Sequence, residues 1–353
     1  MLVFGDLACP NRELSSALHN ALKRSKVFDG HDLLLGNLEG VLVEDGFVDR
    51  ARKLYNSESV LELFAGKKTV FSLANNHIFD YPDKIGATLA TLDKHGIEYV
   101  GLAGPGSAHQ PLRLRYKGEN WVIFGHCWDV MLDISSDKPS DYSINCCSYE
   151  SLLGAVTKAR YQDEDAKVVV YLHWNFDLER LPFPAHRKLA RRLIDVGANV
   201  VIGSHSHCVN GGELYNGGII IYGLGNFFIP DGVFFDGRLK YPEYCKIVLV
   251  VDIADNIEDS VCYWYKVTSD NGLSFVPIGQ ELFKDGPILE RYSPYRAMTY
   301  DEYLRYFKQN RSKSLLVPVW SSYEDTLING AKDRWITTRI RCLRFAKTVL
   351  RMW

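Results

Sequence analysis

The sequence predicts an α/β fold built around a largely buried β-sheet, followed by a C-terminal helical extension. Short apolar runs alternate with helix-like segments through the first two thirds of the chain, which is the pattern of successive βα units. The chain has 353 residues, of which 46% are hydrophobic, enough to bury one large core. Because the alternation fades after about residue 268, we expect one domain over residues 1–267 and an extension over residues 268–353.

The expected strands are the short apolar runs that turn-forming residues separate. They cover residues 1–4, 32–36, 68–73, 97–101, 120–125, 167–172, 199–202, 218–223, 245–253 and 260–267. The expected helices between them carry apolar residues at intervals of three and four. Examples are Leu14, Leu18 and Leu22 in one helix, and Leu189, Leu193 and Val196 in another. Pro184 suits the start of that second helix and Gly197 suits its end.

Composition and charge exclude several classes of protein. The formal net charge is −2 and the pI is near 6.6, so the molecule has no overall field that would attract nucleic acid. The eight cysteines form no CxxC pair, which indicates free thiols in a reducing compartment. The chain enters a strand at once, and no apolar stretch reaches the ~18 residues typical of a membrane span. We therefore expect a cytoplasmic protein without a nucleic-acid partner.

Five of the expected strands end in polar residues of the kinds that bind metal ions. Parallel strands place their carboxyl ends at one edge of a sheet, so these residues should converge on one crevice. The set mixes carboxylate, amide and imidazole groups, which suits Mn, Fe or Zn better than Ca or Mg. The candidate ligands are Asp6, Glu39, Asn76, His173, His205 and His207.

Each of these residues also has a structural interpretation. A single Asp after a strand is most often a helix cap, and a single His is most often a partly buried structural residue. The segment from Gly203 to His207 is more specific, because two imidazoles two residues apart after a buried strand can serve two adjacent metal ions. Five such strand ends in one chain favour a metal site.

The same motifs resemble those of the CapA-type poly-γ-glutamate capsule-synthesis proteins, a branch of the calcineurin-like metallophosphoesterases. The resemblance covers about residues 1 to 255 and implies a layered β-sheet core flanked by helices. Its motifs are Gly5-Asp6, Asn37-Leu38-Glu39, Ala74-Asn75-Asn76-His77 with Asp80-Tyr81, His173-Trp174, Gly203 to His207, and Tyr222-Gly223-Leu224-Gly225-Asn226-Phe227.

The resemblance implies two divalent metal ions, with Mn favoured and Fe or Zn as alternatives. It implies that Glu39 bridges the two ions and that His77 stands beside the leaving group as a general acid. The remaining ligands would divide into Asp6 and His207 on one ion, and Asn76, His173 and His205 on the other.

The sequence departs from the wider metallophosphoesterase pattern at two positions. Ala8 stands where those enzymes have a second histidine, so we expect fewer protein ligands on the first metal. Glu39 stands where an aspartate is usual, and its longer side chain can bridge from a backbone set further back.

Several neighbouring polar residues are candidates for supporting roles. We expect Asn75, Asp80 and Asn226 to fix the histidine rings, although Asn226 could equally hold a turn. Arg52, together with Lys53, could hold anionic groups of a substrate, and a solvated basic surface is the alternative.

The expected function is that of a dinuclear metal-dependent phosphoesterase. Its substrate would be an anionic small molecule or glycan-linked group, a phosphorylated intermediate of bacterial cell-surface or capsular polysaccharide metabolism. Two alternatives stay open. One is an amide hydrolase or transferase acting on poly-γ-glutamate, and the other is a membrane-docked scaffold of a polysaccharide assembly with a structural metal site.

The C-terminal tail, residues 331–353, has its own charge pattern. It carries seven basic residues against the single acid Asp333, and its apolar residues recur as on one helix face. Such a basic amphipathic helix could lie peripherally on the anionic inner face of a membrane. Docking of the same apolar face on the chain's own catalytic domain is the alternative.

Overall fold

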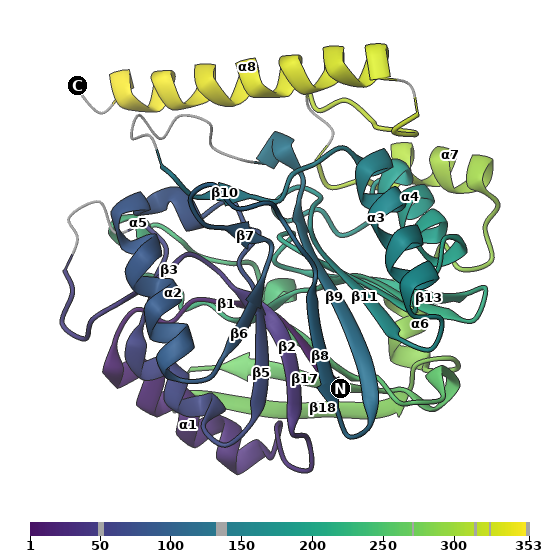
Figure 1. Ribbon diagram of the computed structural model, residues 1–353. Helices are drawn as coiled ribbons and strands as arrows, with labels where there is room; N and C mark the ends of the chain where they lie inside the picture. Colours follow the sequence, from purple (N-terminus) through teal and green to yellow (C-terminus); the bar gives the residue numbers. More distant parts are fainter. Residues whose placement is uncertain (49–52, 132–139, 270–271, 314–315, 325, 351–353) are drawn as a thin grey trace.

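The computed structural model describes residues 1–48, 53–131, 140–269, 272–313, 316–324 and 326–350. Two sheets form its centre, and helices cover the outer face of each (Figure 1). All ten expected strands are present, and most of their apolar residues are buried.

The first sheet has eight strands. Its order is β18-β17-β16-β1-β2-β5-β6, with β15 also paired to β1. Strands β1, β2, β5 and β6 run parallel, whereas β16, β17 and β18 continue the sheet in antiparallel pairs. The bounds are β1 (Leu2–Leu7), β2 (Leu33–Leu38), β5 (Lys68–Ser72), β6 (Glu98–Val100), β15 (Asn226–Phe228), β16 (Ile247–Asp252), β17 (Val261–Thr268) and β18 (Ser274–Leu282).

The second sheet has six strands in the order β13-β14-β12-β11-β9-β8. Its four inner strands are parallel and its two edge strands are antiparallel to them. The bounds are β8 (Leu112–Tyr116), β9 (Glu119–Cys127), β11 (Lys167–His173), β12 (Val200–Ser204), β13 (Val209–Tyr215) and β14 (Gly218–Leu224). Two small pairs complete the strands: β3 (Val41–Val43) with β4 (Tyr55–Ser57), and β7 (Leu102–Ala103) with β10 (Ser143–Ile144).

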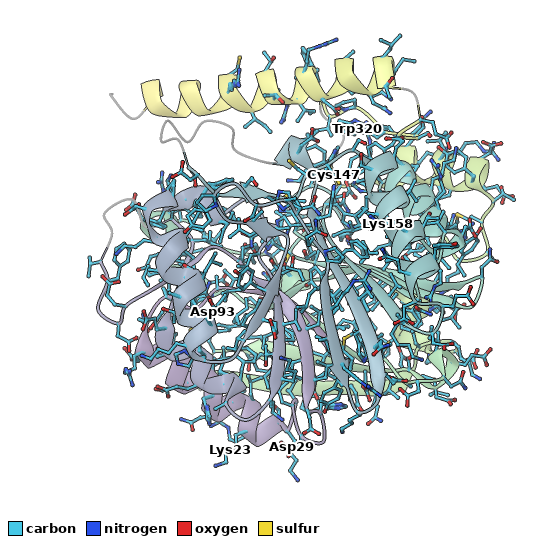
Figure 2. All side chains as sticks on the ribbon, viewed as in Figure 1. Lys23, Asp29, Asp93, Cys147, Lys158 and Trp320 are labelled. Carbon is cyan, nitrogen blue, oxygen red and sulfur yellow. The ribbon has the colours of Figure 1, made fainter. Side chains whose placement is uncertain are left out.

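Side chains from both sheets fill the space between them, including Val3, Val70, Ile123 and Val169. On the outer face of the first sheet lie α1 (Arg12–Ser25) and α2 (Ile85–Lys94), and on that of the second α3 (Tyr149–Gln162) and α4 (Pro184–Asp195). Charged side chains such as Lys23, Asp93 and Lys158 stand on the solvent side of these helices (Figure 2). The remaining elements are α5 (Phe234–Gly237), α6 (Pro287–Tyr292), α7 (Tyr300–Asn310), α8 (Thr326–Leu350), η1 (Glu58–Phe64), η2 (Ile78–Asp80), η3 (Pro82–Lys84), η4 (Asp129–Met131), η5 (Glu243–Lys246) and η6 (Ile257–Asp259).

Strand β18 lies beyond residue 268, where the sequence pattern places the end of the domain. It pairs with β17 along its whole length, so the first sheet continues across that position. The apolar alternation fails to reveal β18 because Pro277 and Gly279 interrupt it. A proline is tolerated at the edge of a sheet, where its missing N–H faces away from a partner strand.

Helix α8 packs on the body of the protein near its amino-terminal half. Ile336 is fully buried, and Trp320 beneath α8 donates a hydrogen bond from Nε1 to Asp333 at 2.8 Å (Figure 2). Trp335 is half exposed. This part of the helix therefore docks on its own chain, while contact of the tail with a membrane stays a prediction. Within the described residues, no helix combines the length and apolar character needed to cross a membrane.

Candidate metal centre

The candidate ligands come from the carboxyl ends of strands in both sheets. Asp6 lies in β1, in register with Asn37 of β2 and with Asn226 of β15. His173 is the last residue of β11. The others lie in the loops that leave β2, β5 and β12. The strand topology thus brings together residues that are almost 200 positions apart, such as Asp6 and the backbone N–H of His205.

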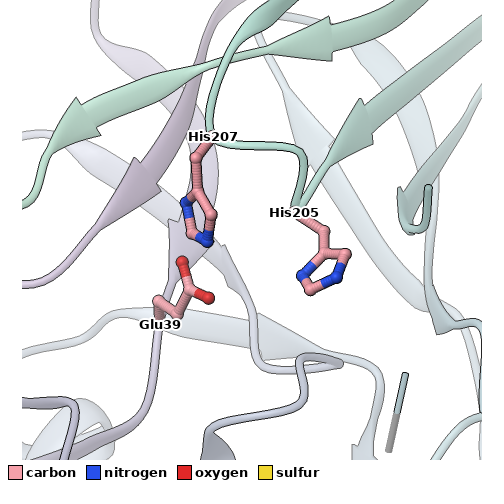
Figure 3. A group of neighbouring side chains, drawn as sticks. All are labelled: Glu39, His205 and His207. Carbon is pink, nitrogen blue, oxygen red and sulfur yellow. The ribbon is translucent and has the colours of Figure 1, made fainter. Parts of the chain in front are cut away.

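Glu39 is the centre of the group. Its carboxylate is fully buried, and neither oxygen has a hydrogen-bond partner among the described residues. One ligand atom each of Glu39, His205 and His207 lies within 4.8 Å of the others, and both imidazole rings approach the carboxylate (Figure 3). Burial, and then the nearby Asp6 carboxylate, raise the pKa of Glu39 well above its ordinary value. A buried carboxylate without a hydrogen bond is costly, and a metal cation beside it would offset that cost.

Two hydrogen bonds hold the Asp6 carboxylate beside His207. Its Oδ1 accepts a hydrogen bond from Asn37 Nδ2 at 2.8 Å, and its Oδ2 accepts one from the backbone N–H of His205 at 3.1 Å. Oδ2 also lies 3.5 Å from His207 Nδ1. Burial raises the pKa of Asp6, and the His207 imidazole counters part of that effect.

His173 and Asn76 form the other side of the centre. His173 Nε2 lies 2.7 Å from Asn76 Oδ1, and its Nδ1 lies 3.0 Å from Ser204 Oγ. The rings of His173 and His205 are 4.6 Å apart. Burial lowers the pKa of His173 well below its ordinary value and lowers that of His205 to about 4. Both imidazoles are therefore neutral at pH 7, the form that binds metal ions.

His205 and His207 both have backbone angles in the left-handed region, with φ of 86° and 58°. Such angles are uncommon for residues other than glycine and concentrate at functional sites. The conformation turns two imidazoles, only two residues apart, toward the same carboxylate (Figure 3).

The donor set fits divalent metal ions. The centre offers a buried carboxylate and an imidazole atom, His205 Nδ1, that accept or donate no hydrogen bond among the described residues. Oxygen and nitrogen donors of this mixture suit Mn, Fe or Zn. The six predicted ligands lie together, and their binding of metal stays a prediction.

Comparison with known proteins agrees with the motifs. Residues 6–231 match the family model of the bacterial capsule synthesis protein PGA_cap. The chain belongs to this family. Over 213 residues it is 29% identical to the PGA biosynthesis protein CapA of Bacillus subtilis strain 168, covering 58% of this chain and 55% of that protein. Over 215 residues it is 29% identical to the capsule biosynthesis protein CapA of Bacillus anthracis, covering 57% and 51%. This PGA_cap chain thus spans about half the length of the curated relatives it matches.

Two solved structures are similar to this chain at 12% identity and a TM-score of 0.41. One is the NAD nucleotidase NadN of Haemophilus influenzae, covering 95% of this chain and 67% of that one. The other is a putative 5'-nucleotidase from Staphylococcus aureus in complex with alpha-ketoglutarate, covering 86% and 57%. The fold class predicted from the sequence is confirmed, since the PGA_cap chain is an α/β protein whose layered sheets are flanked by helices.

His77 lies at the edge of the candidate metal centre, where its side chain is partly exposed. Its side chain is 19% exposed, with Nε2 3.9 Å from Glu39 Oε1 and Nδ1 2.8 Å from Asp80 Oδ2. Burial alone would lower the pKa of His77, but the carboxylates of Asp80, Asp177 and Asp6 act together against it, so the pKa is raised. A raised pKa favours the protonated form of the imidazole, the form that could donate a proton.

The predicted supporting residues also lie at the centre. Asn75 accepts hydrogen bonds from the backbone N–H groups of Gly40 and His77, at 3.2 Å each, and donates to Leu38 O at 2.9 Å. It therefore ties the loop of Glu39 to the loop of His77. Asn226 Oδ1 lies 2.8 Å from His207 Nδ1. Arg52 lies outside the described residues.

Two residues beside the centre escaped prediction. Asp177 Oδ1 lies 3.3 Å from His205 Nε2, and Tyr241 packs its ring 5.0 Å from that of His207. Asp177 follows His173 by four positions in the loop after β11, so a search of that loop for carboxylates would have found it. Tyr241 lies in a segment with no periodic signal.

Proposed function

We propose that this chain is a metal-dependent phosphoesterase that acts on a phosphorylated intermediate of bacterial cell-surface or capsular polysaccharide metabolism. The observation that carries the proposal is the buried carboxylate of Glu39, which has no hydrogen-bond partner among the described residues and lies close to the imidazoles of His205 and His207. Membership of the capsule-synthesis family supports the metabolic setting.

The mechanism assigns a separate task to each side of the centre. Glu39, His205 and His207, with Asp6, Asn76 and His173, would hold two divalent ions, which supply an activated water and offset negative charge on the ester. His77 donates the proton on Nε2 to the leaving oxygen. Asp80 holds the Nδ1–H side of the ring, which fixes its orientation and favours the protonated form.

A second candidate is amide hydrolysis or transfer on poly-γ-glutamate, which the name of the relative PGA biosynthesis protein CapA favours. Both reactions need an activated water and stabilisation of a developing oxyanion. Assays with aryl phosphate monoesters and diesters, run beside release of glutamate from the polymer, separate them. Turnover of a phosphate ester without glutamate release supports the phosphoesterase, and the reverse supports the amide hydrolase.

If the metal-loaded protein turns over neither substrate, the result supports the third alternative, a scaffold whose metal site is structural. The substrate proposed for the phosphoesterase is an anionic small molecule or a glycan-linked group.

Metal binding should release protons from the centre. In the metal-free protein Glu39 has a raised pKa and holds a proton to higher pH than an ordinary carboxyl, whereas His173 and His205 are already neutral. We expect roughly one proton released per centre filled, and tighter binding as pH rises toward the pKa of Glu39. Calorimetric titration with Mn²⁺ in two buffers of different ionisation enthalpy measures the number. Equal heats in the two buffers would contradict the assignment of Glu39.

The basic tail should bind anionic vesicles if part of it faces a membrane. We expect co-sedimentation with phosphatidylglycerol vesicles, little with phosphatidylcholine vesicles, and a marked loss in the variant Arg334→Gln/Arg341→Gln. Both arginines are exposed, so their removal leaves the docked contact of Ile336 intact. Equal pelleting with both vesicle types would remove the membrane hypothesis.

A further inference from the structure

A cavity of about 340 Å³ lies outside the candidate metal centre. Its walls come from the loop after β11, the start of β13, η5, α6 and α7. None of the candidate metal ligands lines it, but Cys208, which follows His207 directly, does. The cavity is therefore a separate space that shares one stretch of backbone with the metal centre.

Two arginines, Arg180 and Arg291, line this cavity. Both are exposed, and neither has a carboxylate within 4.0 Å among the described residues. The contrast with α4 is clear, because Arg187 and Arg191 there share the buried carboxylate of Glu213 at 3.0 and 2.8 Å. The cavity thus has two guanidinium groups in its lining that form no ion pair within the described part of the chain.

Three tyrosines, Tyr244, Tyr292 and Tyr306, also line the cavity, as does Asn310. The Arg180 guanidinium lies 5.5 Å from the centre of the Tyr244 ring. Tyr292 is fixed by stacking on Trp264, with ring centres 5.1 Å apart and planes 20° apart. Burial raises the pKa of the Tyr244 and Tyr292 hydroxyls, so both remain hydrogen-bond donors at neutral pH.

We propose that this cavity binds an anionic group of a ligand, a phosphate or a carboxylate, through Arg180 and Arg291. Guanidinium groups form paired, charge-assisted hydrogen bonds with either group, and the tyrosine hydroxyls add neutral donors. The inference goes beyond the proposed function, because the site lies outside the metal centre and its occupation requires no hydrolysis.

The test is calorimetric titration of the full chain with inorganic phosphate and, separately, with glutarate. The variant Arg180→Gln/Arg291→Gln should bind at least one probe about tenfold more weakly or worse, since two charge-assisted contacts are removed. The matched control is Arg113→Gln/Arg115→Gln, which makes the same charge change on exposed residues of β8. This strand and β13, which borders the cavity, are the two opposite edges of the second sheet. Affinity of the control should stay within about twofold of the unaltered chain.

Weakened binding of phosphate alone identifies a phosphate-bearing ligand, and weakened binding of glutarate alone a carboxylate-bearing one. Arg180→Lys/Arg291→Lys keeps the positive charge and loses the paired hydrogen bonds. Its affinity should lie between that of the glutamine variant and that of the unaltered chain. It also serves if the glutamine variant fails to fold. Unchanged affinity for both probes in the folded variants, or no binding of either probe by the unaltered chain, would overturn the proposal.

Discussion

Replacing His205 by alanine should abolish hydrolysis of phosphate esters and sharply reduce bound metal, while the fold stays largely intact. His205 presents an unpaired Nδ1 to the centre and belongs to the three residues whose ligand atoms lie within 4.8 Å. It lies in the loop after β12, at the carboxyl ends of the strands, so no strand pairing depends on its side chain. Elemental analysis, circular dichroism and turnover of an aryl phosphate measure the three effects.

Asp6→Asn should give the same loss by a different route. The amide keeps the shape of the carboxylate and loses its charge, and a neutral group is less costly to bury at this fully buried position. His19→Ala, on the exposed face of α1, is the matched control and should keep full activity. Full activity in either Asp6→Asn or His205→Ala would contradict the two-metal interpretation.

His77→Ala should lower turnover by about 10²–10⁴-fold, the usual contribution of a positioned acid or base, with metal content unchanged. The residue lies at the opening of the centre, with Nε2 3.9 Å from Glu39 and Nδ1 held by Asp80. Loss of metal in this variant would reassign His77 as a ligand.

Asp80→Asn refines the same prediction through the pH profile. Asp80 raises the pKa of His77 against the opposing effect of burial, so its removal should lower that pKa. An acid that must be protonated loses activity as pH rises through its pKa. The fall in activity at high pH should therefore begin at a lower pH in Asp80→Asn, and an unchanged profile would argue against His77 as the acid.

The convergence of the candidate ligands could be predicted from the sequence because each of them follows the apolar run of a strand. Such runs locate strand ends well, and the carboxyl ends of parallel strands converge whatever the length of chain between them. The same runs do not say which sheet each strand joins. Here the resemblance to the family, and not the periodicity, supplied the layered arrangement of the core.

The residues that escaped prediction lie in segments whose apolar residues follow no regular spacing. Asp177 and Tyr241 come from loops, and their contacts with His205 and His207 depend on how those loops fold over the centre. Strand β18 was missed because Pro277 breaks its alternation at the sheet edge. In each case tertiary packing, rather than local sequence pattern, fixes the position.

The central claim is that this centre hydrolyses phosphate esters with bound divalent metal. The most direct measurement strips the purified chain of metal, reloads it with Mn²⁺, Fe²⁺ or Zn²⁺, and follows aryl phosphate hydrolysis against metal content in the same samples. We expect no turnover after stripping, recovery in proportion to bound metal, and saturation near two ions per chain. Turnover that survives stripping, or none at full metal occupancy on any phosphate ester, would contradict the account.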